Sequence, residues 1–229
     1  MVELSPSILS CDFSKLQENL DQTKNTQLKM IHIDVMDGKF VKNNNLDNMY
    51  EKFKIIDNIS ILKKEVHLMT YDLKERIDEY ALNNVSVITI HKDAIENNSL
   101  EEIIKYIKSY DIQVGIAIKP NENIEDIFPY LKDLSKVTIM SVEPGKGGQT
   151  FIEETYKKIS KLKKEIKKQG LYTLIQVDGG INDSNIQKIY KSGADSVVIG
   201  SYLAKDVKDI EKIISKVENL KKLESISNN

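Results

Sequence analysis

The sequence predicts an α/β fold, a (β/α)8 TIM barrel that forms a single domain. Two observations support this: short β-branched segments recur at roughly even spacing along 229 residues, and charged amphipathic segments separate them. Eight strand–helix units of under about thirty residues each suit a compact closed barrel. An open doubly wound sheet is the alternative. We disfavour it because the first expected strand lacks the Gly-x-Gly-x-x-Gly turn of dinucleotide-binding folds.

The expected strands are the eight segments in which β-branched residues concentrate. In chain order they span residues 5–9, 30–35, 64–68, 86–91, 113–119, 137–142, 174–177 and 196–199. Helix-start signals lie between them. Ser99 with Glu102 and Ser14 with Gln17 have the spacing of a capping box, and a helix is expected from about Thr150. This alternation predicts parallel strands joined by crossover helices.

The chain shows no internal domain boundary. No linker rich in Pro, Gly or Ser divides it, so residues 1–223 are expected to form one catalytic barrel, with 224–229 as a polar C-terminal tail. The longest irregular stretch, residues 36–48, follows the second strand. Barrel enzymes place active-site loops at such positions.

Composition limits the partners. With 33 basic and 35 acidic residues, the formal charge is −2 and no single-sign patch dominates, which argues against nucleic acid. No apolar run approaches membrane-spanning length, so no membrane partner is expected. One cysteine, Cys11, excludes an internal disulfide, and residues 1–9 lack the pattern of a signal peptide. We therefore expect a cytoplasmic protein.

Four polar residues fall at the carboxyl ends of strands, where barrels of this kind place catalytic groups. His32 and Asp34 are two residues apart on one strand and share a side, while His67 and Asp178 end two other strands. Singly, such residues are often hydrogen-bonded core or turn formers. Together, two imidazoles and two carboxylates around one mouth would be costly to bury without a cation. The set favours a divalent metal, Zn, Fe, Co or Mn, over Mg or Ca.

Three methionines continue the pattern at the strand ends. Met36 lies two residues after Asp34, Met69 two after His67, and Met140 ends the sixth strand. Methionine most often fills a core, but at these positions it predicts a water-poor lining over the reacting carbon. His91 ends the fourth strand and is a candidate partner of a metal ligand, with an ordinary core position equally open.

Glycine-rich loops follow the last three strands. Gly145, Lys146, Gly147 and Gly148 follow the sixth, Gly179 and Gly180 the seventh, and Gly200 with Ser201 the eighth. One such loop is weak evidence, because Gly also marks ordinary turns. Loops seven and eight of these barrels, with a helix N-terminus, recurrently bind phosphate. Three converging loops therefore predict a phosphorylated ligand, and Lys146 either assists phosphate binding or faces solvent.

Several motifs, in order, resemble the ribulose-phosphate 3-epimerase family over nearly the whole chain. They are Pro6-Ser7-Ile8-Leu9-Ser10, His32-Ile33-Asp34-Val35-Met36-Asp37-Gly38, His67-Leu68-Met69, Met140-Ser141-Val142 with Pro144-Gly145, and Val177-Asp178-Gly179-Gly180-Ile181. The resemblance implies a barrel of the ribulose-phosphate-binding type and a homo-oligomer such as a dimer. Three positions depart from the family pattern, Lys42 in place of proline, Glu143 in place of Asn and Lys146 in place of Phe. These departures concern loop closure and substrate affinity.

The resemblance also implies roles for individual residues. His32, Asp34, His67 and Asp178 correspond to the metal ligands, and Asp34 and Asp178 also to the acid/base pair. The residues expected to contact substrate are Ser7, Met36, His67, Met69, Met140, Gly145, Lys146, Gly147, Gly148, Asp178, Gly179, Gly180, Gly200 and Ser201.

The expected function is a metal-dependent interconversion of D-ribulose 5-phosphate and D-xylulose 5-phosphate in the pentose phosphate pathway. Two-base proton transfer at C3 would pass through a metal-stabilised enediolate. The alternatives are a 3-epimerase of a six-carbon ketose phosphate and a non-catalytic sugar-phosphate-binding barrel. A decarboxylase or aldolase with an Asp-x-Lys-x-x-Asp relay is disfavoured, because Asp37-Gly38-Lys39 begins that pattern but Lys42 occupies its last position.

Overall fold

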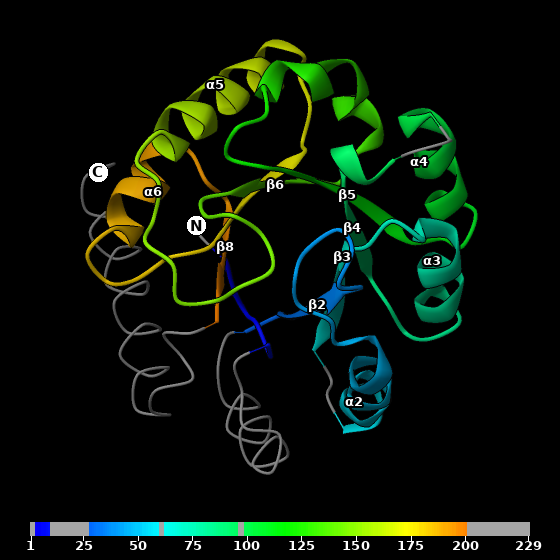
Figure 1. Cartoon of the computed structure of the whole chain (residues 1–229). Coiled ribbons are helices and arrows are strands. Elements are labelled where there is room, and N and C mark those ends of the chain that lie inside the picture. The colour runs from blue at the N-terminus through cyan, green and yellow to red at the C-terminus, as the bar shows by residue number, and fades with distance from the viewer. Residues whose placement is uncertain (1–2, 10–27, 60–61, 96–98, 201–229) are drawn as a thin grey trace.

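The computed structural model describes residues 3–9, 28–59, 62–95 and 99–200. Within these residues one sheet of eight parallel strands has the order β1-β8-β7-β6-β5-β4-β3-β2 (Figure 1). The strands are β1 (Glu3–Pro6), β2 (Met30–Met36), β3 (Lys63–Met69), β4 (Val87–His91), β5 (Gln113–Ile118), β6 (Lys136–Met140), β7 (Leu174–Asp178) and β8 (Ser196–Ile199). The predicted α/β barrel with eight strands is confirmed.

The barrel closes where the first strand changes partner. β1 pairs with β8 as far as Pro6 opposite Ile199. Ser7 then forms a parallel bridge with His32 of β2, and the Ile8 N–H donates to the His32 carbonyl at 3.2 Å. The first strand was predicted over residues 5–9, but it begins and ends earlier, at Glu3–Pro6. Regular pairing with β8 stops at Pro6, before the chain reaches β2.

Helices lie outside the strands (Figure 1). They are α2 (Leu46–Ile59), α3 (Leu73–Ala81), α4 (Leu100–Lys108), α5 (Thr155–Lys168) and α6 (Ile186–Ser192), with 3-10 segments η2 (Lys92–Ala94) and η3 (Ile124–Asp133). Ile103 and Ile107 of α4 are buried one turn apart, as expected of an amphipathic helix. The capping box of Ser99 and Glu102 is confirmed. The one predicted at 14–17 lies outside the described residues.

The helix predicted from Thr150 begins later, at Thr155. Before it begins, the Ile152 N–H donates to the Ser141 carbonyl at 2.9 Å, which ties the segment back to the end of β6. This contact extends the glycine-containing loop and holds its far end against the strand.

Part of the barrel interior is polar. Glu65, Thr89, Thr138 and Gln176 have no exposed surface, and Lys136 is 3% exposed. Because side chains alternate along a strand, Glu65 shares a side with His67, and Gln176 shares a side with Asp178. A layer of polar residues therefore lies one step below the residues at the barrel mouth.

Within the described residues, no helix has the length and apolar character needed to cross a membrane. The predicted tail, 224–229, falls outside the described part of the chain, and the domain boundary stays a prediction.

Candidate active site

The structure brings four side chains from three strands together at the mouth of the barrel. His32, Asp34, His67 and Asp178 each offer one ligand atom, and these atoms lie within 4.8 Å of one another. Asp34 Oδ1 is 3.2 Å from both His32 Nε2 and His67 Nδ1. Asp178 Oδ2 is 3.6 Å from His32 Nε2 and 3.7 Å from His67 Nδ1. Two imidazole nitrogens and two carboxylate oxygens converging in this way can hold one divalent cation.

The two aspartates have different proton affinities. Burial alone would raise the pKa of Asp34, but His32 and His67 hold it well below its ordinary value. Burial raises the pKa of Asp178 to about 6, where His32 opposes the rise and the Asp34 charge adds to it. The pKa values of the two carboxyl groups are thereby shifted in opposite directions, which is a common property of acid/base pairs.

The histidine nitrogens that face away from the cluster also lie close to polar groups. His32 Nδ1 lies 3.3 Å from Glu65 Oε2, and His67 Nε2 lies 2.9 Å from His91 Nε2. The sequence contains three histidines, and all of them are in this group. His91 therefore does contact a candidate metal ligand. Glu65 was missed from the sequence, although its position two residues before His67 is a usable signal.

Glu65 is the centre of the polar layer below the cluster. Its carboxylate accepts from Lys136 Nζ at 2.7 Å, Thr89 Oγ1 at 2.8 Å and Gln176 Nε2 at 2.9 Å. Burial would raise the pKa of Glu65, but Lys136 and His32 hold it well below its ordinary value. The interior of the barrel thus contains an ionised carboxylate directly behind His32.

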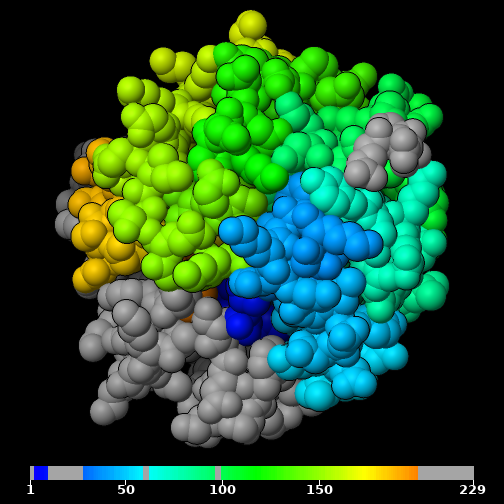
Figure 2. All heavy atoms as spheres, viewed as in Figure 1, coloured from blue at the N-terminus to red at the C-terminus, as the bar shows by residue number. Residues whose placement is uncertain are grey.

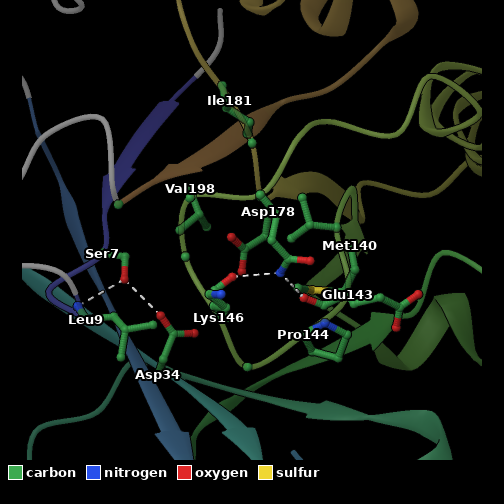
Figure 3. Close-up of a pocket in the computed structure, with 18 of the residues that line it drawn as sticks. Ser7, Leu9, Asp34, Met140, Glu143, Pro144, Lys146, Asp178, Ile181 and Val198 are labelled. Atoms are coloured by element: carbon green, nitrogen blue, oxygen red, sulfur yellow. Dashed lines mark hydrogen bonds between the residues drawn. The ribbon is translucent and has the colours of Figure 1, made fainter. Parts of the chain in front are cut away.

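A pocket opens over the cluster, and most of the residues predicted to contact substrate line it. They are Ser7, Met69, Met140, Gly145, Lys146, Gly147, Gly148, Asp178, Gly179, Gly180 and Gly200, and Asp34 of the expected acid/base pair lines the pocket with them. Figure 3 shows Ser7 and Asp34 on one side of the pocket, with Met140 and Pro144 on the other. Met36 and His67, which were also predicted to contact substrate, are buried and are not among the described residues that line this pocket. Ser201 lies outside the described residues.

Ser7 orients Asp34. Its hydroxyl donates to Asp34 Oδ2 at 2.8 Å, so Oδ1 is the oxygen that faces the two histidines (Figure 3). The partner change of the first strand places Ser7 beside β2. Closure of the barrel and orientation of this aspartate therefore depend on the same short segment.

The glycine loops meet backbone to backbone. Gly180 has a φ of 63°, and a Cβ there would lie 2.7 Å from the Phe151 nitrogen and 2.8 Å from the Gln149 carbonyl oxygen. Only glycine fits this position without a shift of backbone. The N–H groups of Gly147, Gly148 and Gly179 donate to no other described residue, and backbone N–H groups in such loops can bind an anion.

The loop after β2 reaches the glycine loop after β6. The Asp37 carboxylate organises it, accepting from the Phe40 N–H at 2.7 Å and the Tyr71 N–H at 2.9 Å. Asn43 Nδ2 then donates to the Gly145 carbonyl at 2.7 Å, and both segments lie on the face seen in Figure 2. Because Asp37 binds backbone groups of its own loop and of Tyr71, it does not act as the first residue of a catalytic relay.

Comparisons with known proteins agree with the site. The family model of the ribulose-phosphate 3 epimerase family matches residues 3–204. A ribulose-phosphate 3-epimerase of Buchnera aphidicola is 38% identical, covering 86% of each chain, and one of Helicobacter pylori strain J99 is 32% identical, covering 96% of this chain and 98% of that one. N-(5'-phosphoribosyl)anthranilate isomerase of Pyrococcus furiosus has a TM-score of 0.63 at 15% identity, over 96% of this chain and 100% of that one, and shows the shared fold. The chain belongs to the ribulose-phosphate 3-epimerase family of isomerases.

Proposed function

We propose that this protein interconverts D-ribulose 5-phosphate and D-xylulose 5-phosphate, as a step of the pentose phosphate pathway. One observation carries the proposal: the buried Asp34 and the partly buried Asp178, which differ in proton affinity, flank a pocket whose other wall is made of glycine loops. The names of the relatives that match along most of the chain support the same reaction.

Inversion at C3 requires a proton to leave one face of the carbon and another to arrive on the opposite face. Asp34 lies two residues before the end of β2, Asp178 ends β7, and β8 and β1 lie between these two strands around the barrel. A substrate bound between them would lose its C3 proton to one carboxylate and gain a proton from the other carboxyl group. After one conversion the two carboxyl groups have exchanged protonation states, and the enzyme regains its starting state either by exchanging protons with water or by catalysing the reverse conversion.

The residues that would hold a divalent cation are His32, Asp34, His67 and Asp178, and their donor types suit Zn, Fe, Co or Mn. When bound, such a cation supplies Lewis-acid stabilisation of the negative charge that develops on the substrate oxygens. Ser7 keeps one oxygen of Asp34 engaged, and the buried Met69 and Met140 limit water over the reacting carbon.

The loops after β6, β7 and β8 would bind the phosphate. Gly147, Gly148 and Gly179 offer backbone N–H groups, and Lys146 adds a positive charge at the edge of the pocket. Fixing the phosphate would place C3 between the two aspartates. Positioning of this kind contributes to catalysis beyond proton transfer, which alone supplies only about 10²- to 10⁴-fold.

The assay compares substrates and metals on one preparation. The protein is stripped of metal, reloaded with Zn, Fe, Co or Mn in turn, and given ribulose 5-phosphate or a six-carbon ketose 6-phosphate, with products followed by NMR. We expect metal-dependent formation of xylulose 5-phosphate. Faster conversion of the six-carbon substrate would assign a related epimerase, and binding without conversion of either would assign a non-catalytic barrel.

The proposal includes a cytoplasmic homo-oligomer, such as a dimer. Light scattering of the purified full-length chain would test the oligomeric state, with a mass near twice 26.2 kDa expected for a dimer.

A further inference from the structure

Below the candidate metal ligands, the barrel interior contains an ion pair that the proposed reaction does not use. Glu65 Oε2 lies 2.7 Å from Lys136 Nζ, and both side chains are almost completely buried. The same oxygen lies 3.3 Å from His32 Nδ1, a buried nitrogen that forms no fully aligned hydrogen bond with any described residue and has Glu65 as its nearby acceptor. We propose that Glu65 is a positioning residue for the metal centre, which fixes the ring of His32 so that its Nε2 lone pair faces the other ligands, and that Lys136 keeps Glu65 available for this role. The inference rests on the metal centre of the proposed function.

The proton positions on His32 follow from its neighbours. A histidine can bind a metal only through a nitrogen without a proton. Nε2 of His32 faces Asp34 and Asp178, so Nε2 is the ligand atom and the proton must lie on Nδ1. A carboxylate accepts this proton and rejects the opposite tautomer, in which an Nδ1 lone pair would face the anion. Glu65 therefore sets both the orientation and the donor strength of His32.

His67 is supported differently. Its Nδ1 faces the cluster, so Nε2 carries the proton and donates to His91 Nε2 at 2.9 Å. His91 then acts as a neutral acceptor, with its ring also packed against Phe40. The two histidine ligands thus differ: a carboxylate backs His32 and an imidazole backs His67. We expect His32 to be the stronger donor of the two.

Lys136 accounts for the presence of a charged carboxylate in the interior. An unpaired buried carboxylate would be protonated or would destabilise the fold. Lys136 Nζ, Thr89 Oγ1 and Gln176 Nε2 together satisfy Glu65. With these three donors engaged, Glu65 stays ionised and can still accept from His32.

The competing explanation is that Glu65 and Lys136 form an ion pair that only stabilises the barrel. Single substitutions do not distinguish the two explanations, because removing either charged partner leaves the other one buried and unpaired. The double variant Glu65→Gln with Lys136→Met removes both charges at once. It should recover much of the stability lost by Lys136→Met, while the carboxylate behind His32 remains absent.

The experiment measures metal affinity and stability in five full-length proteins: wild type, E65Q, K136M, E65Q/K136M and the matched control T138V. Thr138 is buried in the same layer and donates to Gln176 rather than to Glu65, so its removal leaves the His32 contact intact. Zn²⁺ and Co²⁺ dissociation constants are determined with a competing chelator. We expect E65Q and the double variant to bind metal about 10- to 100-fold more weakly than wild type. The dissociation constants of T138V should stay within about 2-fold of the wild-type values, which is less than the ~1 kcal/mol that a single hydrogen bond contributes.

A second measurement needs no substitution. With three histidines in the sequence, ¹H–¹⁵N spectra of the Zn-loaded protein should resolve each imidazole. We expect a His32 Nδ1 proton shifted strongly downfield by the Glu65 carboxylate. Absence of that proton signal in the wild type, with a resolved His32 ring, would overturn the inference even if no variant folds.

The outcomes also separate the inference from the proposed function. Wild-type protein that binds neither Zn²⁺ nor Co²⁺ would remove the metal centre itself. Wild type that binds metal, together with a double variant that binds it equally well, would leave the centre in place and reduce the ion pair to a structural role.

Discussion

The two sides of the barrel mouth recognise their expected ligands by different means. On the β2–β4 side, His32, His67 and His91 project from strands and are completely buried. On the β6–β8 side, glycine loops present backbone groups, and Gly147 and Gly148 are exposed. Metal binding needs particular side-chain atoms held within tenths of an ångström, which strands provide. Anion binding needs several N–H donors that can close around a group, which loops provide.

Asp178 belongs to both sides. It ends β7 among the glycine loops, yet its carboxylate completes the histidine cluster. Substitutions confined to the strand side should therefore change metal affinity and turnover, those confined to the loops should change KM, and Asp178 should show the largest loss.

We expect Asp178→Asn to lower kcat by about 10³-fold or more, because an amide can still offer an oxygen ligand but cannot carry the proton. Steady-state kinetics on metal-loaded protein would measure the loss, with metal content and circular dichroism as controls. Near wild-type turnover in a folded, metal-loaded variant would remove Asp178 from proton transfer.

Gly180→Ala should damage the loop side alone. The variant requires a left-handed backbone costing about 1–2 kcal/mol and pushes a methyl group against the Phe151 and Gln149 backbone. We expect KM for the sugar phosphate to rise about 10-fold or more, since ~1.4 kcal/mol corresponds to tenfold, with unchanged metal affinity. Gly170→Ala is the matched control, because Gly170 has a φ of 66° but open space around it. A KM effect of equal size in both variants would contradict a specific role for Gly180.

Lys146→Ala should have a smaller effect on the same side. An exposed lysine contributes up to about 1 kcal/mol to binding an anion, so KM should rise by roughly 3- to 5-fold at low salt with little change in kcat. The difference should shrink as ionic strength increases. Lys167→Ala, which removes an exposed lysine of α5 that does not line the pocket, is the control. Equal effects of the two substitutions, or none, would place Lys146 in solvent.

The smallest expected effect lies far from both sides. Asp78 of α3 accepts from the hydroxyl groups of Tyr106 and Tyr110, which lower the pKa of this carboxyl group. Because the pKa of Asp78 is lower in the folded protein than in the unfolded chain, where it is near 3.8, the ionised carboxylate stabilises the fold at pH values above 3.8. This contribution is lost as the pH falls through the folded-state pKa. Asp78→Asn should lower the free energy of unfolding by a few tenths of a kcal/mol at pH 7.

That difference should disappear in acid. Urea unfolding of both proteins between pH 3 and pH 7 would measure it. A difference that grows as the pH falls would contradict the assigned sign.

Much of this arrangement could be predicted from the sequence. Eight β-branched segments predicted the strand count, and the period of two along a strand placed His32 and Asp34 on one side. The strand limits were less accurate at Ser7, because a change of pairing partner leaves no local signal. Helix α5 began later than expected for a similar reason, since the contact from Ile152 to Ser141 is not local in sequence.

The polar layer was harder to predict. Lys136 and Gln176 are 71 and 111 residues from Glu65 in sequence, so neither their contacts nor their burial can be inferred from a local pattern. A lysine at the start of a strand is usually solvent-exposed. Met36 shows the reverse case: the alternation placed it on the same side of the strand as Asp34, but it is not among the described residues that line the pocket.

Solvent labelling during a single conversion tests the two-aspartate reaction most directly. Ribulose 5-phosphate is converted in D2O under initial-rate conditions by metal-loaded protein, and the C3 position of the xylulose 5-phosphate formed is examined by NMR. Two carboxyl groups on opposite faces predict product that carries deuterium at C3 from the first turnover. Product that retains the original hydrogen would show one group moving the same proton across, and would contradict the paired roles of Asp34 and Asp178.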